Sequence, residues 1–507
     1  MLKFKIISWV TLFFLLSFIT NTWSADFTAS NLPVIVISTN GQTVSDTSEI
    51  IAEMGIIYNG SGVINKLTDA FNEYNGKISI KISGGSLQAK YPKKQYDIEM
   101  RDAIGFPTHV SVLEMPAESQ WVLYAPYSDK TMLRSVLAYK LSNDMGRYAS
   151  RTKFCEIVIN GEYRGTYVLT EKIKPGKERV NIEQLTTYDN DITGGYIIKI
   201  DELTGEITNG WYSEYPSNNQ KIFYQYYYPA TSTITSDQKI YIQNYISQFE
   251  KTMKQTDYAN TETGYHAYIN TDSFADFIIL NEIGKNVNAY RLNTFIHKDK
   301  EIYDGKLTMG PIWNFETAFG NANYYESSSV QGWQYDFSCP ECIKDANQVT
   351  FWWKRLLEDP YFRHIIRYRW KELRKNILSL ENISKFIDET ADYLKESQTR
   401  NFEQWPILGK YVSPNEFIGK TYQEEVNYLK EWIQKRFEWM DEQWKIIPGD
   451  INEDGIVNLQ DAILILQLCS ESTPSSAIYK EADISGDEKL GMEEAVYILQ
   501  AVGKMRQ

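Results

Sequence analysis

The chain has 507 residues, 43% of them hydrophobic and 14% aromatic, so it is long enough for more than one domain and apolar enough to fold. Its formal net charge is −14, and the absence of a basic stripe argues against a nucleic-acid-binding protein. Four cysteines in a chain of this length exclude a fold built on a network of disulfides.

The first 24 residues have the pattern of an export signal. Lys3 and Lys5 precede an apolar run over residues 6–19, and small side chains follow it before Ala25. The run is shorter than the ~20 residues that a membrane helix needs, and an uncleaved anchor is the alternative. We therefore expect a signal peptide over residues 1–24 and a mature protein that is secreted and has no membrane segment.

Residues 25–447 form the next expected domain, whose first half is rich in strands and whose second half is helical. The predicted strands cover residues 78–82, 95–100, 121–124, 154–159, 163–170 and 195–200. Asn160-Gly161 between two of them predicts a tight hairpin. The predicted helices cover residues 130–143, 236–255, 271–286, 351–376, 382–396 and 415–444. A mostly β lobe followed by a mostly α lobe indicates an α+β protein, and a two-lobe kinase-like fold has this layout.

Cys339 and Cys342 stand close together and leave three interpretations open. A zinc site needs four ligands as a rule, and no second close pair of Cys or His exists in the sequence. A redox pair needs a thioredoxin-like strand–helix context, which these residues lack. A small disulfide-closed loop, or two ordinary thiols, is the preferred interpretation.

Residues 448–507 are a separate acidic segment, here called the C-terminal module, with a net charge of −7. Its first loop places side-chain or backbone oxygens at Asp450, Asn452, Asp454, Ile456, Asn458 and Asp461. Its second loop repeats the arrangement at Asp483, Ser485, Asp487, Lys489 and Glu494, where Ile456 and Lys489 offer backbone carbonyls. Calcium prefers about six to eight oxygens, and such spacing wraps them around one centre. An apolar helix follows each loop.

This duplicated loop–helix unit resembles a dockerin, the module that attaches secreted proteins to cohesin-bearing scaffolds. The second loop departs from the pattern, because Glu488 replaces a glycine and Gly491 offers no side chain, although Glu494 can bind in bidentate fashion. The resemblance implies a small all-α domain, two calcium ions with the second held more weakly, and a cohesin partner. It also implies a cellulosome-like, polysaccharide-degrading context, but no carboxylate pair typical of a glycosidase is recognisable.

The large domain carries a second resemblance. Residues 280–295 and 310–320 are similar to the CotH family of secreted atypical kinases. Shorter matching pieces lie upstream, at residues 91–96, 127–134, 160–165 and 171–173. The resemblance covers nearly all of the domain in order. It implies a two-lobe kinase fold that binds ATP and Mg²⁺ and phosphorylates Ser or Thr of an extracellular protein.

The chain departs from that family where the chemistry is expected. Asn288 stands at the position of the catalytic Asp, and Asn293 keeps the metal-binding Asn. The family's Trp-Asp-x-Asp motif aligns with residues 313–316, so Asn314 and Glu316 take the metal positions. An amide accepts no proton as a base and carries no charge to balance Mg²⁺. The resemblance therefore implies weak Mg²⁺ binding at Asn293, Asn314 and Glu316. It favours a degenerate or slow kinase, with a non-catalytic pseudokinase as the alternative.

Nucleotide binding is expected to be less affected. Lys94 shares a strand face with Tyr96 and Ile98, so it should point to the apolar side and find an anionic partner. A phosphate or Glu171 would serve, as in the lysine–glutamate pair of kinases. The alternative is a lysine that extends outward from an edge strand. Glycine-containing residues 83–86 could offer N–H groups to phosphates, although Ser83 replaces an arginine of the family.

Overall fold

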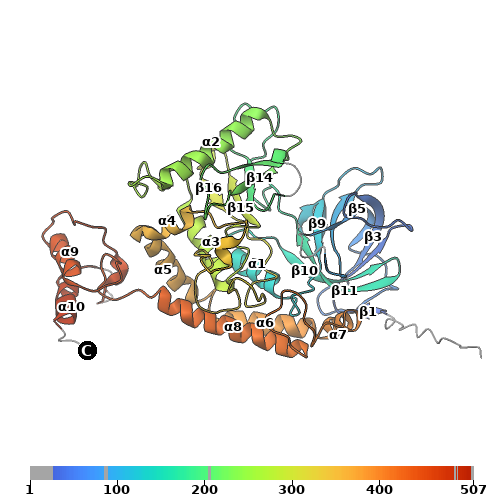
Figure 1. The fold of residues 1–507 in the computed structure, drawn as a ribbon. Helices are drawn as coiled ribbons and strands as arrows, with labels where there is room; N and C mark the ends of the chain where they lie inside the picture. The colour runs from blue at the N-terminus through green and yellow to red at the C-terminus, as the bar shows by residue number, and fades with distance from the viewer. Residues whose placement is uncertain (1–26, 85–89, 204–206, 485–486, 488, 504–507) are drawn as a thin grey trace, which may run out of the picture.

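The computed structural model describes residues 27–84, 90–203, 207–484, 487 and 489–503 (Figure 1). The expected signal peptide lies outside the described residues. A strand-rich lobe comes first, a second lobe of helices around a sheet follows, and the C-terminal module lies at the far end (Figure 1). The predicted α+β class is confirmed. Within the described ranges, no helix has the length and apolar character to cross a membrane.

The first lobe is a closed barrel in the strand order β10, β11, β9, β6, β5, β3, β2. These strands are β2 (Val34–Ser38), β3 (Ile50–Ile57), β5 (Tyr74–Ser83), β6 (Gln95–Arg101), β9 (Gln120–Tyr124), β10 (Thr152–Ile159) and β11 (Glu162–Glu171). Neighbours are antiparallel, except that β10 pairs with β2 in parallel and so closes the barrel. The predicted hairpin is confirmed, because Asn160 and Gly161 join β10 to β11 with φ of 53° and 80°. Large side chains such as Trp121 and Tyr167 fill the interior.

Short strands flank the barrel: β1 (Ala29–Ser30) pairs with β4 (Asn65–Lys66), and β7 (Val110–Val112) pairs with β8 (Met115–Glu118). The second lobe contains an antiparallel sheet of β13 (Gly210–Tyr212), β14 (Phe223–Tyr228), β12 (Tyr196–Ile200), β15 (Thr294–Lys298) and β16 (Leu307–Met309) in that order. Its helices are α2 (Ser236–Met253), α3 (Thr271–Gly284), α4 (Trp352–Glu358), α5 (Pro360–Arg374), α6 (Leu380–Tyr393), α7 (Lys395–Gln404) and α8 (Tyr422–Gln443). Helix α1 (Arg134–Asp144) lies between the two lobes (Figure 1).

Three expected helices are wrong in their extent. The helix predicted over residues 351–376 is divided into α4 and α5, because Pro360 has no N–H to continue α4 and suits the first turn of a new helix. Asp359 caps α5 by accepting the N–H of Tyr361 at 3.1 Å. The helix predicted over residues 382–396 ends at Tyr393, and α7 begins at Lys395. The helix predicted over residues 415–444 begins only at Tyr422, where Thr421 caps α8.

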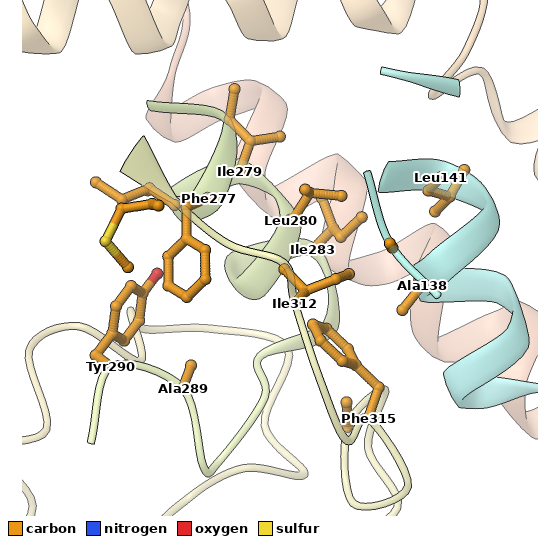
Figure 2. Packing of buried hydrophobic residues seen from close by; sticks show 14 of the residues in the cluster. Ala138, Leu141, Phe277, Ile279, Leu280, Ile283, Ala289, Tyr290, Ile312 and Phe315 are labelled. Carbon is orange, nitrogen blue, oxygen red and sulfur yellow. The ribbon is translucent and has the colours of Figure 1, made fainter. Parts of the chain in front are cut away.

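Helix α3 is buried on nearly every side, which fixes the loop that follows it. In Figure 2, Leu280 and Ile283 of α3 lie toward Ile312 and Ala138 of α1, while Phe277 packs against Tyr290. Because every residue of α3 from Ser273 to Gly284 is buried, the helix forms the centre of the second lobe rather than a surface helix.

A buried ion pair anchors the end of α3 to α8. The fully buried carboxylate of Glu282 accepts hydrogen bonds from Arg436, the hydroxyl of Tyr290 and the N–H groups of Gln334 and Tyr335, all at 3.0 Å. Burial raises the pKa of Glu282 and lowers the pKa of Arg436 to about 10. These contacts join α3, α8 and the loop of Tyr290 into one rigid unit.

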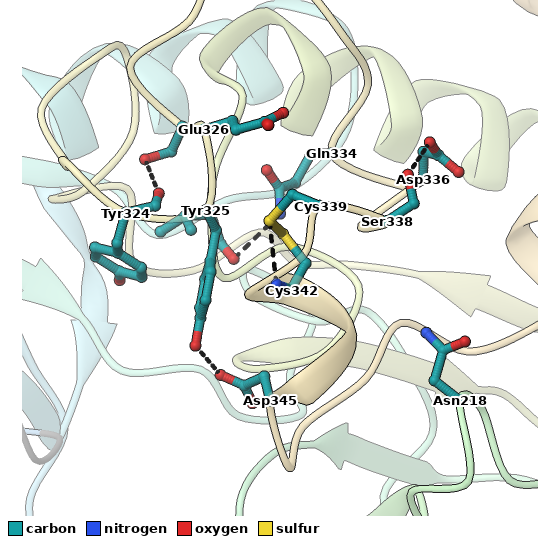
Figure 3. The surroundings of a disulfide bond; sticks show 12 residues. Asn218, Tyr324, Tyr325, Glu326, Gln334, Asp336, Ser338, Cys339, Cys342 and Asp345 are labelled. Atoms are coloured by element: carbon teal, nitrogen blue, oxygen red, sulfur yellow. Dashed lines mark hydrogen bonds between the residues drawn. A yellow bond between two sulfur atoms is a disulfide. The ribbon is translucent and has the colours of Figure 1, made fainter.

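The segment between β16 and α4 is closed by a disulfide between Cys339 and Cys342 (Figure 3). The disulfide-closed loop is thus the correct one among the interpretations of this cysteine pair. Gln348 donates to the carbonyl of Cys342 at 2.9 Å, and Tyr325 donates to Asp345 at 2.6 Å. These bonds hold the loop compact.

In the C-terminal module, α9 (Leu459–Cys469) packs against α10 (Met492–Val502) around a small apolar core. Ile465 and Ile498 are fully buried in it. The module contacts the second lobe through α5, where Glu453 lies 2.7 Å from Nδ1 of His364 and the ring of Tyr479 stacks on that histidine.

We predict that Arg436→Met destabilises the protein by about 3–5 kcal/mol, because it leaves the Glu282 carboxylate buried without its partner. The matched control is Lys430→Met on the same helix, which removes a partly exposed pair with Asp388 and should cost about 0–1 kcal/mol. Urea unfolding of both variants measures the difference. Equal losses would show that the buried pair has no special role.

Candidate functional site

A cavity of about 90 Å³, here called the interlobe cavity, lies between the barrel and the second lobe. Its walls are formed by Gly84, Gln95, Val122, Tyr124, Ser135, Val136, Tyr139, Thr152, Val168, Thr170, Asn293, Trp313 and Asn314. No charged side chain stands among these described residues. The volume is below the ~300–1,000 Å³ of pockets for whole drug-sized ligands, and it suits one part of a larger ligand.

The hairpin of β15 and β16 brings Asn293 and Asn314 to this cavity. Asn293 directly precedes β15, and Asn314 follows β16 by a few residues. Since Ile296 pairs with Met309 in antiparallel register, both asparagines fall at the same end of the hairpin. Both adopt the left-handed conformation, with φ of 50° and 60°, which asparagine tolerates better than most residues.

Helix α1 holds the segment of Asn314 from the other side. The hydroxyl of Tyr139 accepts the N–H of Asn314 at 3.0 Å, and the hydroxyl of Ser135 accepts the N–H of Phe315 at 3.2 Å. The ring of Tyr139 lies nearly parallel to that of Trp313, with centroids 5.9 Å apart. Burial raises the pKa of Tyr139, so its hydroxyl stays protonated. The role of Tyr139 was not predicted from the sequence, although its ring partner Trp313 belongs to the family motif at residues 313–316.

Asn288 lies in the loop after α3 and is tied to the segment of Asn314. Its amide donates to the hydroxyl of Thr317 at 3.4 Å, and its backbone N–H donates to Asn286 at 3.2 Å. Asn286 in turn donates to the carbonyl of Asn314 at 3.4 Å. The two loops that carry asparagine in place of aspartate are therefore side by side.

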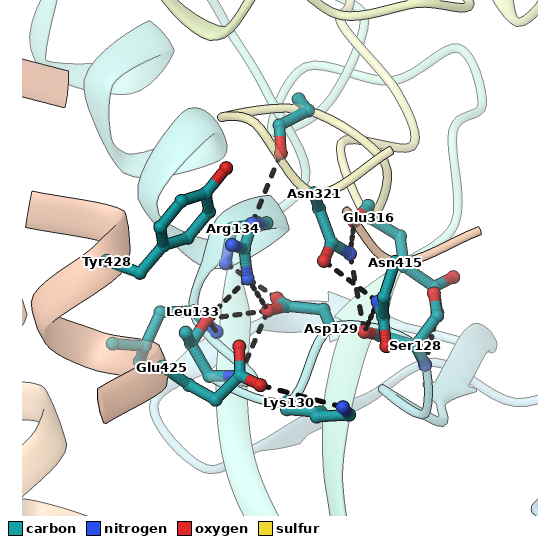
Figure 4. Close-up of polar contacts among 12 residues, drawn as sticks. Ser128, Asp129, Lys130, Leu133, Arg134, Glu316, Asn321, Asn415, Glu425 and Tyr428 are labelled. Carbon is teal, nitrogen blue, oxygen red and sulfur yellow. Dashed lines mark hydrogen bonds and ion pairs between the residues drawn. The ribbon is translucent and has the colours of Figure 1, made fainter. Parts of the chain in front are cut away.

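Glu316 occupies a different place. Its carboxylate is fully buried and accepts the N–H and the hydroxyl of Ser128 at 3.1 and 2.6 Å. Asn321 and Asn415 bind the carbonyl of Ser128 in the same network (Figure 4). Glu316 does not line the interlobe cavity, so it does not join Asn293 and Asn314 there. Two neutral amides without a carboxylate do not fit Mg²⁺, which proteins bind through carboxylates.

The expected pair of Lys94 and Glu171 does not form. Glu171 is fully buried, and its ion pairs are with Arg151 at 2.9 Å and Arg179 at 3.8 Å. Neither Lys94 nor Glu171 lines the interlobe cavity. Of the glycine-containing loop, Gly84 lines the cavity, while residues 85 and 86 lie outside the described residues.

The buried lysine is the neighbouring Lys93. Strand β6 begins at Gln95, so the alternation that assigned Lys94 to the inner face does not extend back to that residue. The ammonium of Lys93 donates to the carbonyl of Thr166 at 2.5 Å and to the amide oxygen of Asn401 at 2.9 Å. Burial among these uncharged acceptors lowers the pKa of Lys93 to about 7.

The first loop of the C-terminal module curls around two buried carboxylates. Asp450 accepts the N–H of Gly455 at 2.9 Å, and Asp461 accepts those of Ile451 and Asn458 at 2.8 and 2.9 Å. Desolvation and the neighbouring acids raise the pKa of Asp450.

The other expected ligands of this loop bond to one another. Asn452 donates to Asp454 at 3.0 Å, and Asn458 donates to the carbonyl of Ile456 at 3.1 Å. In the described ranges, no three His, Cys, Asp or Glu side chains are gathered as a metal site. A cation at this loop would therefore draw on the amide and carbonyl oxygens as well as the carboxylates.

The second loop is described only in part, because Ser485 lies outside the described residues. Asp487 accepts the N–H of Lys489 at 2.9 Å, and Asp483 is half-buried at the start of the loop. Glu494 is 2% exposed, and its Oε1 has no hydrogen-bond partner in the described part of the chain. Such a buried carboxylate oxygen suits a bound cation.

We predict that the lowered pKa of Lys93 makes stability depend on pH. Between about pH 7 and its unfolded value of 10.5, only the unfolded chain keeps this proton, so stability rises with pH by about 1.4 kcal/mol per unit. Below about pH 7 both states are protonated and the slope disappears. Lys285 and Lys298, whose pKa values are lowered to about 8, add to the rise at higher pH. Unfolding free energies between pH 7 and 9.5 should therefore rise less steeply in Lys93→Met than in the wild type, by about 1.4 kcal/mol per unit. The Lys94→Met control should keep the wild-type slope, and equal slopes in Lys93→Met and the wild type would contradict the assignment.

Comparison with known proteins identifies the large domain. The family model for "CotH kinase protein" matches residues 80–440, from β5 into α8. This range contains the interlobe cavity and the loops of Asn288 and Asn314, but no part of the C-terminal module. No curated protein matches the chain. Because the match covers more than half of its residues, the chain belongs to the CotH kinase protein family.

Proposed function

We propose that this chain is a kinase-fold binding protein that holds the base of a nucleotide between its lobes without efficient phosphoryl transfer. We further propose that it is secreted and attached to a cohesin-bearing scaffold through its C-terminal module. The observation that carries the first part is the uncharged wall of the interlobe cavity, where a kinase needs metal-binding carboxylates.

The chemistry of the wall supports binding more than catalysis. Phosphoryl transfer depends on a carboxylate that orients the acceptor hydroxyl and on cations that balance the phosphates. The amide of Asn288 is engaged with Thr317 and accepts no proton. Loss of one catalytic group lowers kcat by on the order of 10⁴-fold in well-characterised enzymes. A slow Ser/Thr kinase is the competing proposal.

The same wall suits an uncharged aromatic ligand. Tyr139 and Trp313 offer flat rings, and stacking of a nucleic-acid base on such a ring is worth about 1–3 kcal/mol. Gln95 and Thr170 add hydrogen-bonding groups without charge. Discrimination between bases would then come from these polar groups rather than from the phosphates.

The calcium proposal rests on the repeated loop–helix units. Both loops end in a buried carboxylate, Asp461 in the first and Glu494 in the second. Calcium would be held by Asp450, Asn452, Asp454, Ile456, Asn458 and Asp461 in the first loop, and by Asp483, Ser485, Asp487, Lys489 and Glu494 in the second. Its charge would relieve the repulsion among these acids, so binding and folding of the module would be coupled.

The cohesin proposal is supported by matching apolar side chains that the two helices leave exposed. These side chains recur at the same spacing and are Leu459, Ile463 and Leu466 on α9 and Met492, Val496 and Leu499 on α10. Repeated apolar stripes of this kind mark protein-interaction surfaces. A partner protein such as a cohesin could cover either stripe, because α9 and α10 present apolar side chains at the same spacing.

We predict that the full-length protein incorporates no phosphate from radiolabelled ATP above background with either Mg²⁺ or Mn²⁺. The double variant Asn288→Asp/Asn314→Asp should gain measurable incorporation, because it restores a charge to each loop. Asn270→Asp adds the same charge at the N-cap of α3, where aspartate caps equally well, and should remain inactive. Wild-type incorporation at the rate of the double variant would contradict the proposal.

We also predict that calcium protects the C-terminal module of the full-length protein from proteolysis and that a chelator removes the protection. Asp461→Ala should weaken calcium binding at least about tenfold, because it deletes a buried charged ligand. Glu471→Gln, which neutralises an exposed acid outside both loops, is the control and should bind calcium normally. Cleavage that is unaffected by chelator would refute calcium binding here.

A further inference from the structure

A second cavity, of about 190 Å³, lies behind the segment that leads to Asn314. It is lined by the end of α1, by α3 and β16, and by residues 310–312. It shares no lining residue with the interlobe cavity. Arg147 and Arg179 line it, and no acidic side chain does.

Arg179, which lines this cavity, has one guanidinium nitrogen without a hydrogen-bond partner among the residues that the structure describes. The side chain is 5% exposed, and its Nη1 donates to the carbonyls of Gln120 and Lys172 at 3.0 and 2.6 Å. Its Nη2 is buried without a hydrogen-bond partner in the described part of the chain. The neighbouring carboxylate of Glu171 is 3.8 Å away and is already bound by Arg151. A buried donor left in this state is costly unless a ligand satisfies it.

Arg147 is in a similar position. Its partner Asp276 lies 2.7 Å away and also pairs with Arg369 at 2.8 Å, so one carboxylate serves two guanidinium groups. Around the cavity, Glu171 and Asp276 therefore balance four arginines. The exposed Glu178, 3.9 Å from Arg151, adds a weaker negative charge at the rim. Asp299 and Glu118 also act on side chains around the cavity, but Arg147 and Arg179 have no acidic side chain beside them in its wall, so an anion there would satisfy them.

We propose that the second cavity binds a small oxyanion, such as inorganic phosphate. Guanidinium groups present paired N–H donors that match the oxygens of phosphate, and the excess positive charge selects an anion. The volume admits a free oxyanion, whereas a complete nucleotide needs a larger space.

Occupancy of this cavity would affect the interlobe cavity. Gly310, Pro311 and Ile312 form part of its wall and connect directly to Trp313 and Asn314. An anion held against this segment would restrain the two residues that line the other cavity. The oxyanion is thus a candidate regulator of ligand binding in the interlobe cavity. This coupling rests on the function proposed above.

Isothermal titration of the full-length protein with sodium phosphate tests the site. We expect saturable binding of one anion per chain, weakened about tenfold or more by Arg147→Gln. Arg369→Gln is the matched control, because it removes the other guanidinium from Asp276 without touching the cavity, and its affinity should stay within about twofold of wild type. Asn181→Asp, at an exposed position of the cavity wall, should weaken binding without disturbing the fold.

Three results would overturn the proposal. Wild-type protein that shows no saturable phosphate binding would exclude the site. Equal losses in Arg147→Gln and Arg369→Gln would place the anion elsewhere. A parallel titration with AMP separates the two cavities, because Arg147→Gln should leave AMP binding unchanged. If Arg147→Gln weakens the binding of both AMP and phosphate, the arginines bind the phosphate of a nucleotide and not a separate anion. If only AMP binding is lost, the function proposed for the interlobe cavity is refuted and the anion site is not.

Discussion

The buried carboxylate of Glu282 is the contact on which the position of the loop that carries Asn288 depends. It holds the end of α3 to Arg436 of α8, and it accepts the hydroxyl of Tyr290 from the loop that carries Asn288. A charge removed from water is tolerated only when all its partners are in place, so this group permits few alternative arrangements of the loop. The strand hairpin that follows then carries Asn293 and Asn314 to one cavity. The kinase-like frame is therefore fixed by groups outside the cavity, and it can persist when the side chains inside it change.

The distribution of charged side chains shows how the kinase-like fold can be kept without the groups that phosphoryl transfer needs. The interlobe cavity is lined by amides, hydroxyls, aromatic rings and valines, whereas the nearby carboxylates of Glu316 and Glu171 are buried in structural networks. An uncharged wall favours a flat, neutral group and offers nothing to balance a triphosphate with its metal. The cationic side chains Arg147 and Arg179 line the second cavity instead. Membership of the CotH kinase protein family thus establishes the fold of the large domain, and the side chains decide what that fold can do.

Local pattern was enough for much of the fold. Alternating strands and the Asn160-Gly161 turn were predicted because period and turn chemistry are properties of neighbouring residues. Closure of the barrel was not predicted, since the pairing of β2 with β10 joins segments far apart in the chain. The break at Pro360 was missed although the sequence contains its signal. In the candidate site, the resemblance indicated Asn293 and Asn314, but the burial of Lys93 just before β6 was not predicted. The arginine partners of Glu171 depend on tertiary packing that no local pattern encodes.

The most direct test of the central claim is the affinity of the full-length protein for AMP, measured by titration calorimetry with and without Mg²⁺. An uncharged wall that binds the base predicts one dissociation constant under both conditions, and a loss of binding in Trp313→Ala. Affinity that rises about tenfold or more with Mg²⁺, a change of about 1.4 kcal/mol, would contradict the account, because it would require metal ligands that the cavity lacks.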